Sequence, residues 1–205
     1  MWTGDAELEE QPGDWNTREL VDRLRVGEIE RFRDLYERIA PSLHAWGRLR
    51  LRPGQGAGLD PDDLLQEVWM RALEGLAEFD PSRSGFRAWV FGIAKNVAYE
   101  NERRSRNPRI ANDSSAGSVA MRAWPDVETS VRSRLASDDS VQRFIDLASG
   151  LDPLDRGLLV HCGLEDLPCT LAAARLGMGA EAAFKRWQRL RSRLREGKLV
   201  ELLED

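Results

Sequence analysis

The chain is poor in the residues that build disulfide frameworks and metal centres. It has two cysteines, Cys162 and Cys169, and two histidines among 205 residues. Two thiols in a chain of this length do not make the framework of a small secreted domain. Because His161 stands beside Cys162, a three-ligand metal site is conceivable, but small buried thiols on helices are the commoner arrangement. We therefore predict no disulfide framework and no metal site.

Long apolar runs and catalytic motifs are also missing. No run of about 18 apolar residues occurs, so we expect no transmembrane helix. The acidic start of the chain lacks the apolar stretch of a secretory signal, and we expect a cytoplasmic protein. No nucleophile–base pair, phosphate-binding glycine loop or metal-ligand spacing stands out. The sequence thus predicts a protein that is not an enzyme, with no catalytic residues and no cofactor.

Excess positive charge is lacking too, which taken alone argues against nucleic acid as a partner. The net charge is −5 and the isoelectric point is about 5.3. The distribution changes this interpretation, because residues 1–17 hold five acids and no base, so that residues 18–205 sum to zero. We predict that residues 1–17 form a disordered acidic leader and that charge in the remainder is sorted into blocks.

Helical periodicity is present along most of the chain, and no convincing strand pattern appears, so we predict an all-α fold. Residues 107–138 differ, because they contain Asn-Pro, Trp-Pro and a run of Asn, Asp, Ser and Gly. We expect two small helical domains, 18–106 and 139–197, joined by a flexible linker at 107–138 and followed by an acidic tail at 198–205. The expected helices are 18–26, 28–50, 61–77, 86–105, 141–149, 152–162, 168–176 and 180–195.

One predicted helix has a strongly acidic outer face. Residues 60–80 contain seven acids and one base, and Asp60 and Pro61 are typical of a helix start. On a helical wheel Leu65, Val68 and Trp69 face the core, with Ala72 and Leu76. The opposite face favours a docking surface for a basic protein or, alternatively, an ordinary solvated surface. It carries Asp63, Gln66, Glu67, Met70 and Glu74.

The helix predicted after residue 85 interleaves aromatic and basic residues. Its buried stripe is expected to hold Phe86, Trp89, Val90, Ile93 and Val97. The other side, with Arg103 and Arg104 extending the charge, fits single-stranded nucleic acid, because cations follow phosphates and rings stack on unpaired bases. The alternative is a core helix with a solvated basic end. That other side carries Arg87, Phe91, Lys95, Tyr99 and Arg106.

The last predicted helix is basic. Residues 185–198 hold seven bases and one acid, and a turn at Gly177 separates this helix from the one before it. Two helices joined by a short glycine-containing turn favour a helix-turn-helix that inserts its second helix into the major groove. A basic helix that only faces water is the alternative. The helix is expected to bury Ala183, Trp187, Leu190 and Leu194, and to expose Lys185, Arg186, Arg189 and Arg193.

Two stretches carry a family resemblance. Residues 63–73 (DLLQEVWMRAL) and 86–98 (FRAWVFGIAKNVA) resemble the region-two core and the melting helix of bacterial sigma factors, in the extracytoplasmic-function (ECF) group of the sigma-70 family. Residues 27–38 resemble the opening helices of that family. Residues 151–153 and 171–195 resemble its second domain less closely. The resemblance covers about 18–106 and 139–195.

The resemblance implies a promoter-specificity subunit. It implies that the acidic helix binds the clamp helices of the polymerase β′ subunit, that the second domain meets the flap of the β subunit, and that an anti-sigma protein is a common partner of the group. The residues implied for core polymerase binding are Asp63, Gln66, Glu67, Met70 and Glu74. Those implied for recognising and melting the −10 element are Arg87, Phe91, Lys95, Asn96, Tyr99, Arg103, Arg104 and Arg106. Those implied for the −35 element are Glu181, Lys185, Arg186, Gln188, Arg189 and Arg193.

The second domain departs from the family pattern. Leu171 and Ala172 stand where an acid and a β-branched residue are usual, and Gly179 and Glu181-Ala182-Ala183 replace a Ser and Gly-Thr-Val. Lost hydroxyls mean fewer phosphate contacts at the start of the helix. Two rival functions stay open: a helix-turn-helix regulator that binds duplex DNA without polymerase, and an all-α protein-interaction module.

Overall fold

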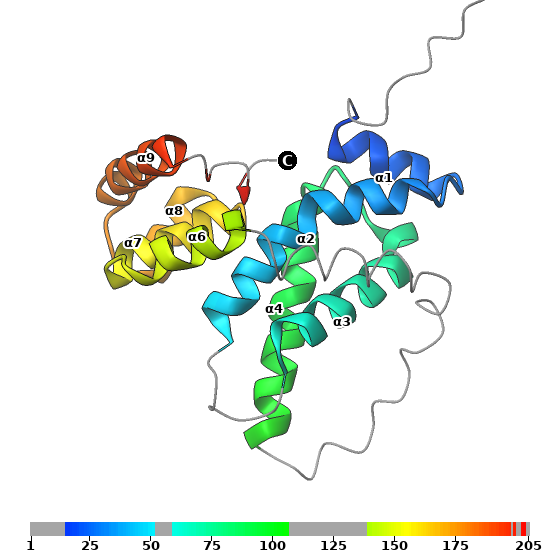
Figure 1. Cartoon of the computed structure of the whole chain (residues 1–205), viewed down its shortest axis with the longest axis horizontal. Helices are drawn as coiled ribbons and strands as arrows, with labels where there is room; N and C mark the ends of the chain where they lie inside the picture. The colour runs from blue at the N-terminus through cyan, green and yellow to red at the C-terminus, as the bar shows by residue number, and fades with distance from the viewer. Residues whose placement is uncertain (1–14, 52–58, 107–138, 198, 200–201, 204–205) are drawn as a thin grey trace, which may run out of the picture.

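The computed structural model describes residues 15–51, 59–106, 139–197, 199 and 202–203, and every regular element within them is helical. Figure 1 shows two groups of helices, the first made of α1 to α4 and the second of α6 to α9. We call these groups the first unit and the second unit. The predicted all-α class is confirmed. None of the helices in the described residues is long and apolar enough to cross a membrane.

The first unit begins earlier than the sequence predicted. Helix α1 (Thr17–Arg25) starts with a reciprocal cap in which Asn16 and Glu19 each bond the other's backbone N–H. Trp15 is buried, with the guanidinium groups of Arg23 and Arg31 each 4.1 Å from its ring centre. The assignment of 15–17 to a disordered leader is therefore wrong, because an indole held between two cations and a cap order these residues. Residues 1–14 lie outside the described part of the chain.

The remaining helices of the first unit follow the predicted pattern closely. Helix α2 (Arg31–Arg50) is followed by α3 (Pro61–Glu74), whose start is capped by Asp60 through a 2.8 Å bond from the Asp63 N–H. A 3-10 turn, η1 (Leu76–Glu78), and α4 (Phe86–Arg106) complete the unit. Helix α3 packs against both α2 and α4. The five core positions predicted for α3 are all buried, as are Phe86, Val90 and Val97 of α4, while Trp89 and Ile93 are half-buried.

The second unit contains one departure from regular helix. Helices α6 (Asp139–Ser149) and α7 (Pro153–Leu158) are followed by a π-helical turn, Leu159–Leu164, where a single α-helix over 152–162 was predicted. The wider turn is closed by a 2.9 Å bond from the Glu165 N–H to the Val160 carbonyl. Asp166 then adopts a left-handed conformation, with φ of 50°, which an aspartate tolerates better than most residues. This geometry directs the Glu165 side chain back toward the first unit.

The last two helices are joined by a tight turn. Helix α8 (Cys169–Arg175) leads through Gly177, whose φ is 65°, into α9 (Ala180–Glu196). Ala183, Trp187, Leu190 and Leu194 are buried as predicted, and α8 packs against α9. The turn at Gly177 and the amphipathic pattern of α9 thus agree with the sequence prediction.

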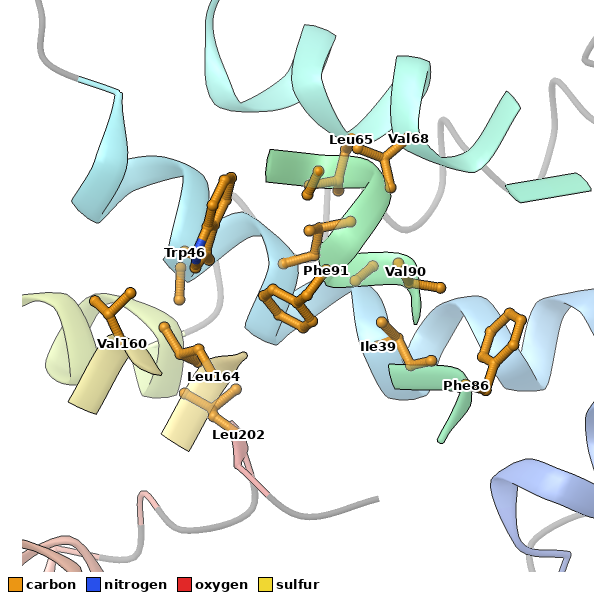
Figure 2. Close-up of a cluster of buried hydrophobic side chains, with 14 of the residues drawn as sticks. Ile39, Trp46, Leu65, Val68, Phe86, Val90, Phe91, Val160, Leu164 and Leu202 are labelled. Atoms are coloured by element: carbon orange, nitrogen blue, oxygen red, sulfur yellow. The ribbon is translucent and has the colours of Figure 1, made fainter. Parts of the chain in front are cut away.

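The two units share a single core. Helix α2 packs against α6 and against the π-helical turn. Figure 2 shows Trp46 and Phe91 of the first unit beside Val160, Leu164 and Leu202 of the second, and all five belong to one buried cluster. The sequence predicted two separate domains, and periodicity within one helix could not reveal that their apolar surfaces meet. The predicted linker, 107–138, lies outside the described residues.

The predicted acidic tail is also partly built into the core. Leu199 and Leu202 are buried, and the Leu202 carbonyl accepts a hydrogen bond from Arg87 of α4. The description of 198–205 as only an acidic tail is therefore wrong for these two residues. Their apolar side chains cover the end of the second unit, which a composition rule based on the neighbouring acids overlooks.

Replacing Gly177 with alanine tests the turn between α8 and α9. A Cβ at this position would meet nothing within 4 Å, so the cost arises from the left-handed backbone alone. We expect Gly177→Ala to lower the free energy of unfolding by about 1 kcal/mol in urea titration. Gly92→Ala is the matched control, because Gly92 has equally open space and lies inside α4, where alanine is favoured over glycine. Equal effects of both substitutions would contradict the assigned turn.

Candidate polymerase and nucleic-acid interfaces

The aromatic and basic face predicted on α4 is divided by the second unit. Phe91 is 0% exposed and Arg87 is 2% exposed. The expectation that Phe91 lies on a side the core does not use is wrong, because its ring packs edge-on against Trp46, with ring centres 6.1 Å apart. Trp46 belongs to α2, so this side of α4 is part of the core of the first unit and also lies beside Leu164 of the second unit.

Arg87 is held at the boundary between the units. Its Nε donates to the Leu164 carbonyl at 3.2 Å and its Nη2 to the Leu202 carbonyl at 2.8 Å. The guanidinium carbon also lies 5.3 Å from the centre of the Phe91 ring. A buried charge needs such partners, because removing it from water unpaired is costly. In this arrangement the Arg87 side chain faces protein rather than solvent.

The C-terminal half of the same helix stays accessible. Tyr99 is 67% exposed, and Asn96 and Arg103 are also exposed. Lys95 and Arg104 are half-buried, the latter with one amino group 3.7 Å from Glu100. The side chain of Arg106 lies outside the described residues. An exposed ring among cations is the arrangement that single-strand binding requires, and it is present here without Phe91.

The predicted acidic face of α3 forms one side of a groove. The groove has a volume of about 290 Å³ and lies between α3 and α4, with Asp63, Gln66, Glu67 and Met70 on one side and Glu100 and Arg104 on the other. Asp63 and Glu74 are exposed, and Gln66, Glu67 and Met70 are half-buried. Glu74 is not among the lining residues. The structure therefore brings together four of the five residues predicted for this surface.

Arg71 connects the two sides of the groove, and sequence reasoning missed its role. Its guanidinium group donates to Glu67 at 2.7 Å and to both carboxylate oxygens of Glu100, at 3.1 and 2.9 Å. The hydrogen bond from Arg71 holds the pKa of the Glu100 carboxyl below its ordinary range, against the opposing effect of burial. Residues 60–80 hold seven acids and a single base, Arg71. A lone base in an acidic segment could have indicated that Arg71 pairs with acidic side chains.

The basic face of α9 is less uniform than its sequence suggested. Lys185, Gln188, Arg189 and Arg193 are exposed, and Lys185 pairs with Glu181 at 2.5 Å. Arg186 differs, because it donates to Asp155 at 2.7 Å and to Asp152 at 2.6 Å. These bonds join α9 to the start of α7, so Arg186 has a structural role that the helical wheel did not predict.

Glu165 is the most unusual titratable residue that the sequence analysis overlooked. Its side chain is 0% exposed, and it accepts a 2.9 Å bond from the Trp46 indole N–H. Lys95 and Arg175 approach the second carboxylate oxygen at 3.5 and 3.6 Å, and His161 Nδ1 lies 3.1 Å from it. Burial would raise the pKa of Glu165, but its hydrogen bonds and the neighbouring charges lower it to about 2.

The two cysteines are free thiols, and burial is the main cause that raises the pKa of Cys162 to about 12. A thiol with such a pKa is neutral near pH 7, and metals bind the thiolate. Within the described ranges, no group of three or more His, Cys, Asp or Glu side chains is placed to hold a metal ion. The geometry here thus gives no candidate metal centre.

Known proteins resemble this chain over the same helices. The Sigma-70 region 2 family model matches residues 35–107. The ECF RNA polymerase sigma factor BldN of Streptomyces coelicolor is 30% identical over 88 residues, which are 43% of this chain and 32% of BldN. The match therefore spans about a third of that relative's length.

A second relative matches over a longer stretch. The RNA polymerase sigma factor CnrH of Cupriavidus metallidurans is 31% identical over 142 residues, which are 66% of this chain and 71% of CnrH. A solved structure of CnrH in complex with the cytosolic domain of CnrY covers 88% of this chain and 95% of that one, with 25% identity and a TM-score of 0.43. On these sequence matches, the chain belongs to the sigma-70 family of RNA polymerase sigma factors, in its ECF group.

Proposed function

We propose that this chain binds core RNA polymerase in the cytoplasm and directs promoter-specific initiation by recognising −35 and −10 elements and helping to melt the duplex. The observation that carries the proposal is the pairing, inside the region 2 match, of an acidic groove on α3 with an exposed aromatic and basic stretch on α4. No covalent chemistry is required of the chain, because binding energy alone can open a duplex when single-strand contacts repay the unstacking cost.

The acidic groove is the proposed binding surface for core polymerase. Asp63 presents an exposed carboxylate in the groove and Met70 adds a soft apolar side chain, while Glu74 carries a further exposed carboxylate on α3 outside the groove. Such a surface suits a basic helical partner, because charge complementarity guides docking and a methionine adapts to the partner's shape. We assign it to the clamp helices of the β′ subunit.

The accessible half of α4 is the proposed −10 surface. Asn96, Tyr99 and Arg103 stand in water, where a ring can stack on an extruded base while a cation follows the backbone. Arg104 and Lys95 lie beside this stretch. Arg87 can join it only after the second unit moves away from α4, because Arg87 donates to the Leu164 and Leu202 carbonyls.

The exposed bases of α9 are the proposed −35 surface, with α8, the Gly177 turn and α9 forming a helix-turn-helix. Arg189 and Arg193 are exposed on α9. We also propose that the second unit meets the flap of the β subunit. The similarity to CnrH, which has been solved with the cytosolic domain of CnrY, supports a regulatory protein partner of the anti-sigma kind for this chain.

Core binding is tested by Met70→Asp. The substitution replaces the apolar side chain that a partner would cover with a charge that must lose its water, and we expect it to weaken binding of core polymerase about tenfold or more, measured with labelled chain and purified core. Ala77→Asp is the matched control, because Ala77 is exposed outside the groove. Similar losses for both would show that added charge, rather than the groove, causes the effect. Unchanged binding of Met70→Asp would favour a regulator that acts without polymerase.

Tyr99 and Phe91 should respond to alanine in different ways. In holoenzyme, we expect Tyr99→Ala to weaken binding of a −10 single strand by about 1–3 kcal/mol, with the free energy of unfolding nearly unchanged. Phe91→Ala should lower that free energy by about 3–5 kcal/mol, because it removes a fully buried ring. Ile29→Ala truncates an exposed apolar side chain outside α4 and serves as the control. If Tyr99→Ala matches the control, the proposed stacking role is excluded.

Substitutions at two arginines of α9 distinguish a residue that contacts DNA from one that stabilises the fold. Arg189→Gln should reduce the dependence of log K for −35 duplex on log salt by about 1, because one phosphate contact is lost. Arg186→Gln should instead lower the thermal midpoint, because it breaks the bonds to Asp152 and Asp155. A salt dependence that Arg189→Gln leaves unchanged would remove Arg189 from the proposed interface.

A further inference from the structure

The buried carboxylate of Glu165 is bonded across the boundary between the two units. It belongs to the second unit, yet it accepts the Trp46 indole N–H of α2 at 2.9 Å and faces the Lys95 ammonium of α4 at 3.5 Å. From its own unit it is approached by His161 and Arg175. One carboxylate thus connects both helices of the first unit that border the second.

The cations on this side of α4 have anionic or carbonyl partners supplied by the second unit. Lys95 faces the Glu165 carboxylate, and Arg87 donates to the Leu164 and Leu202 carbonyls. Cations that face an oxygen-rich surface of this kind are also suited to phosphate oxygens. The second unit therefore occupies the positions that a nucleic-acid backbone would take beside these side chains.

A charge at a fully buried position is stabilising only while its partners are present. Removing one partner of a buried ion pair leaves an uncompensated charge, which is far more costly than losing an exposed pair. Separation of the units takes Trp46 and Lys95 from Glu165 together and leaves it with His161 and Arg175 of its own unit. The contact favours the closed arrangement because only there does the carboxylate bond both the Trp46 indole and the Lys95 ammonium.

We propose that Glu165 holds the chain in a closed, autoinhibited arrangement in which the second unit covers Arg87, Phe91 and Lys95. In this arrangement the carboxylate takes the place of a DNA phosphate beside Lys95. The assignment of DNA as the competing ligand rests on the proposed function, whereas the closed arrangement itself does not. Opening would expose the two cations, Arg87 and Lys95, and extend the accessible surface of α4 along the helix from Tyr99.

The proposal has a thermodynamic consequence. If DNA binds the open form alone, its apparent affinity is reduced by the fraction of molecules that are open. Weakening the closed form raises that fraction without altering any DNA contact. A substitution at Glu165, which lies outside the proposed DNA surface, should therefore tighten binding, which is the opposite of what a damaged interface does.

The test uses the full chain carrying Glu165→Gln. The amide keeps the size of the side chain and an oxygen for the Trp46 bond, but it loses the charge that faces Lys95. We expect the radius of gyration from small-angle X-ray scattering to rise, with helix content by circular dichroism unchanged. Affinity for a −10 single strand, measured without polymerase, should rise about fivefold or more. Glu196→Gln makes the same charge change at an exposed position of α9 and should alter neither quantity.

A second variant tests the same ion pair in case Glu165→Gln does not fold. Lys95→Gln removes the same ion pair from the first unit and leaves Glu165 with His161, Arg175 and Trp46. Its radius of gyration should also rise, and only scattering is used for it because Lys95 is a proposed DNA contact. If both variants fold and scatter as the unsubstituted chain does, the closing role of Glu165 is overturned.

The two readouts separate this inference from the proposed function. A larger radius of gyration with no gain in DNA affinity would support the closing role and contradict DNA as the competing ligand. A gain in affinity with unchanged scattering would overturn the closing role. A rise in both supports the inference in full.

Discussion

Burial of one side of α4 against the second unit is the constraint on which the presentation of this sigma factor's surfaces depends. Helices α2 and α3 cover the other side, so α4 has no exposed residue from Phe86 to Lys95 and several exposed residues beyond it. Phe91 is consequently a core residue and Tyr99 a surface residue, although both were predicted on the same face. Phe91 packs against Trp46 of α2 at the boundary between the units, whereas Tyr99 lies about two turns farther along α4 and is exposed.

Charge pairing explains why the two candidate surfaces keep their shapes. Arg71 joins α3 to α4 through Glu100 and also holds Glu67, while Asp63 stays exposed at the groove. Arg186 performs the corresponding task between α7 and α9. Each arginine offers a planar set of donors that can bond two carboxylates, which a lysine at either position would not reproduce. The exposed acids and bases nearby are then presented at fixed spacing.

Local features of the chain were predictable because they depend on neighbouring residues. The Asp60 cap, the buried stripe of α3 and the turn at Gly177 each follow from a few adjacent side chains. The contact between the units was not predictable, because Glu165 lies 119 positions from Trp46 and 70 from Lys95, and nothing in the periodicity of 152–162 announces a π-helical turn. Trp15 was missed for a related reason, since its partners Arg23 and Arg31 follow an acidic stretch that dominates the composition. Sequence reasoning therefore located the groove and the exposed end of α4, but it could not show which of their residues the fold conceals.

The central claim is that this chain confers promoter specificity on RNA polymerase. Run-off transcription with core enzyme, on promoter fragments from the chain's own genome, tests that claim directly. The account predicts discrete transcripts that start at defined positions when the chain is added, and none from core enzyme alone. The absence of a specific start on every promoter tested, with a folded chain bound to core, would contradict it.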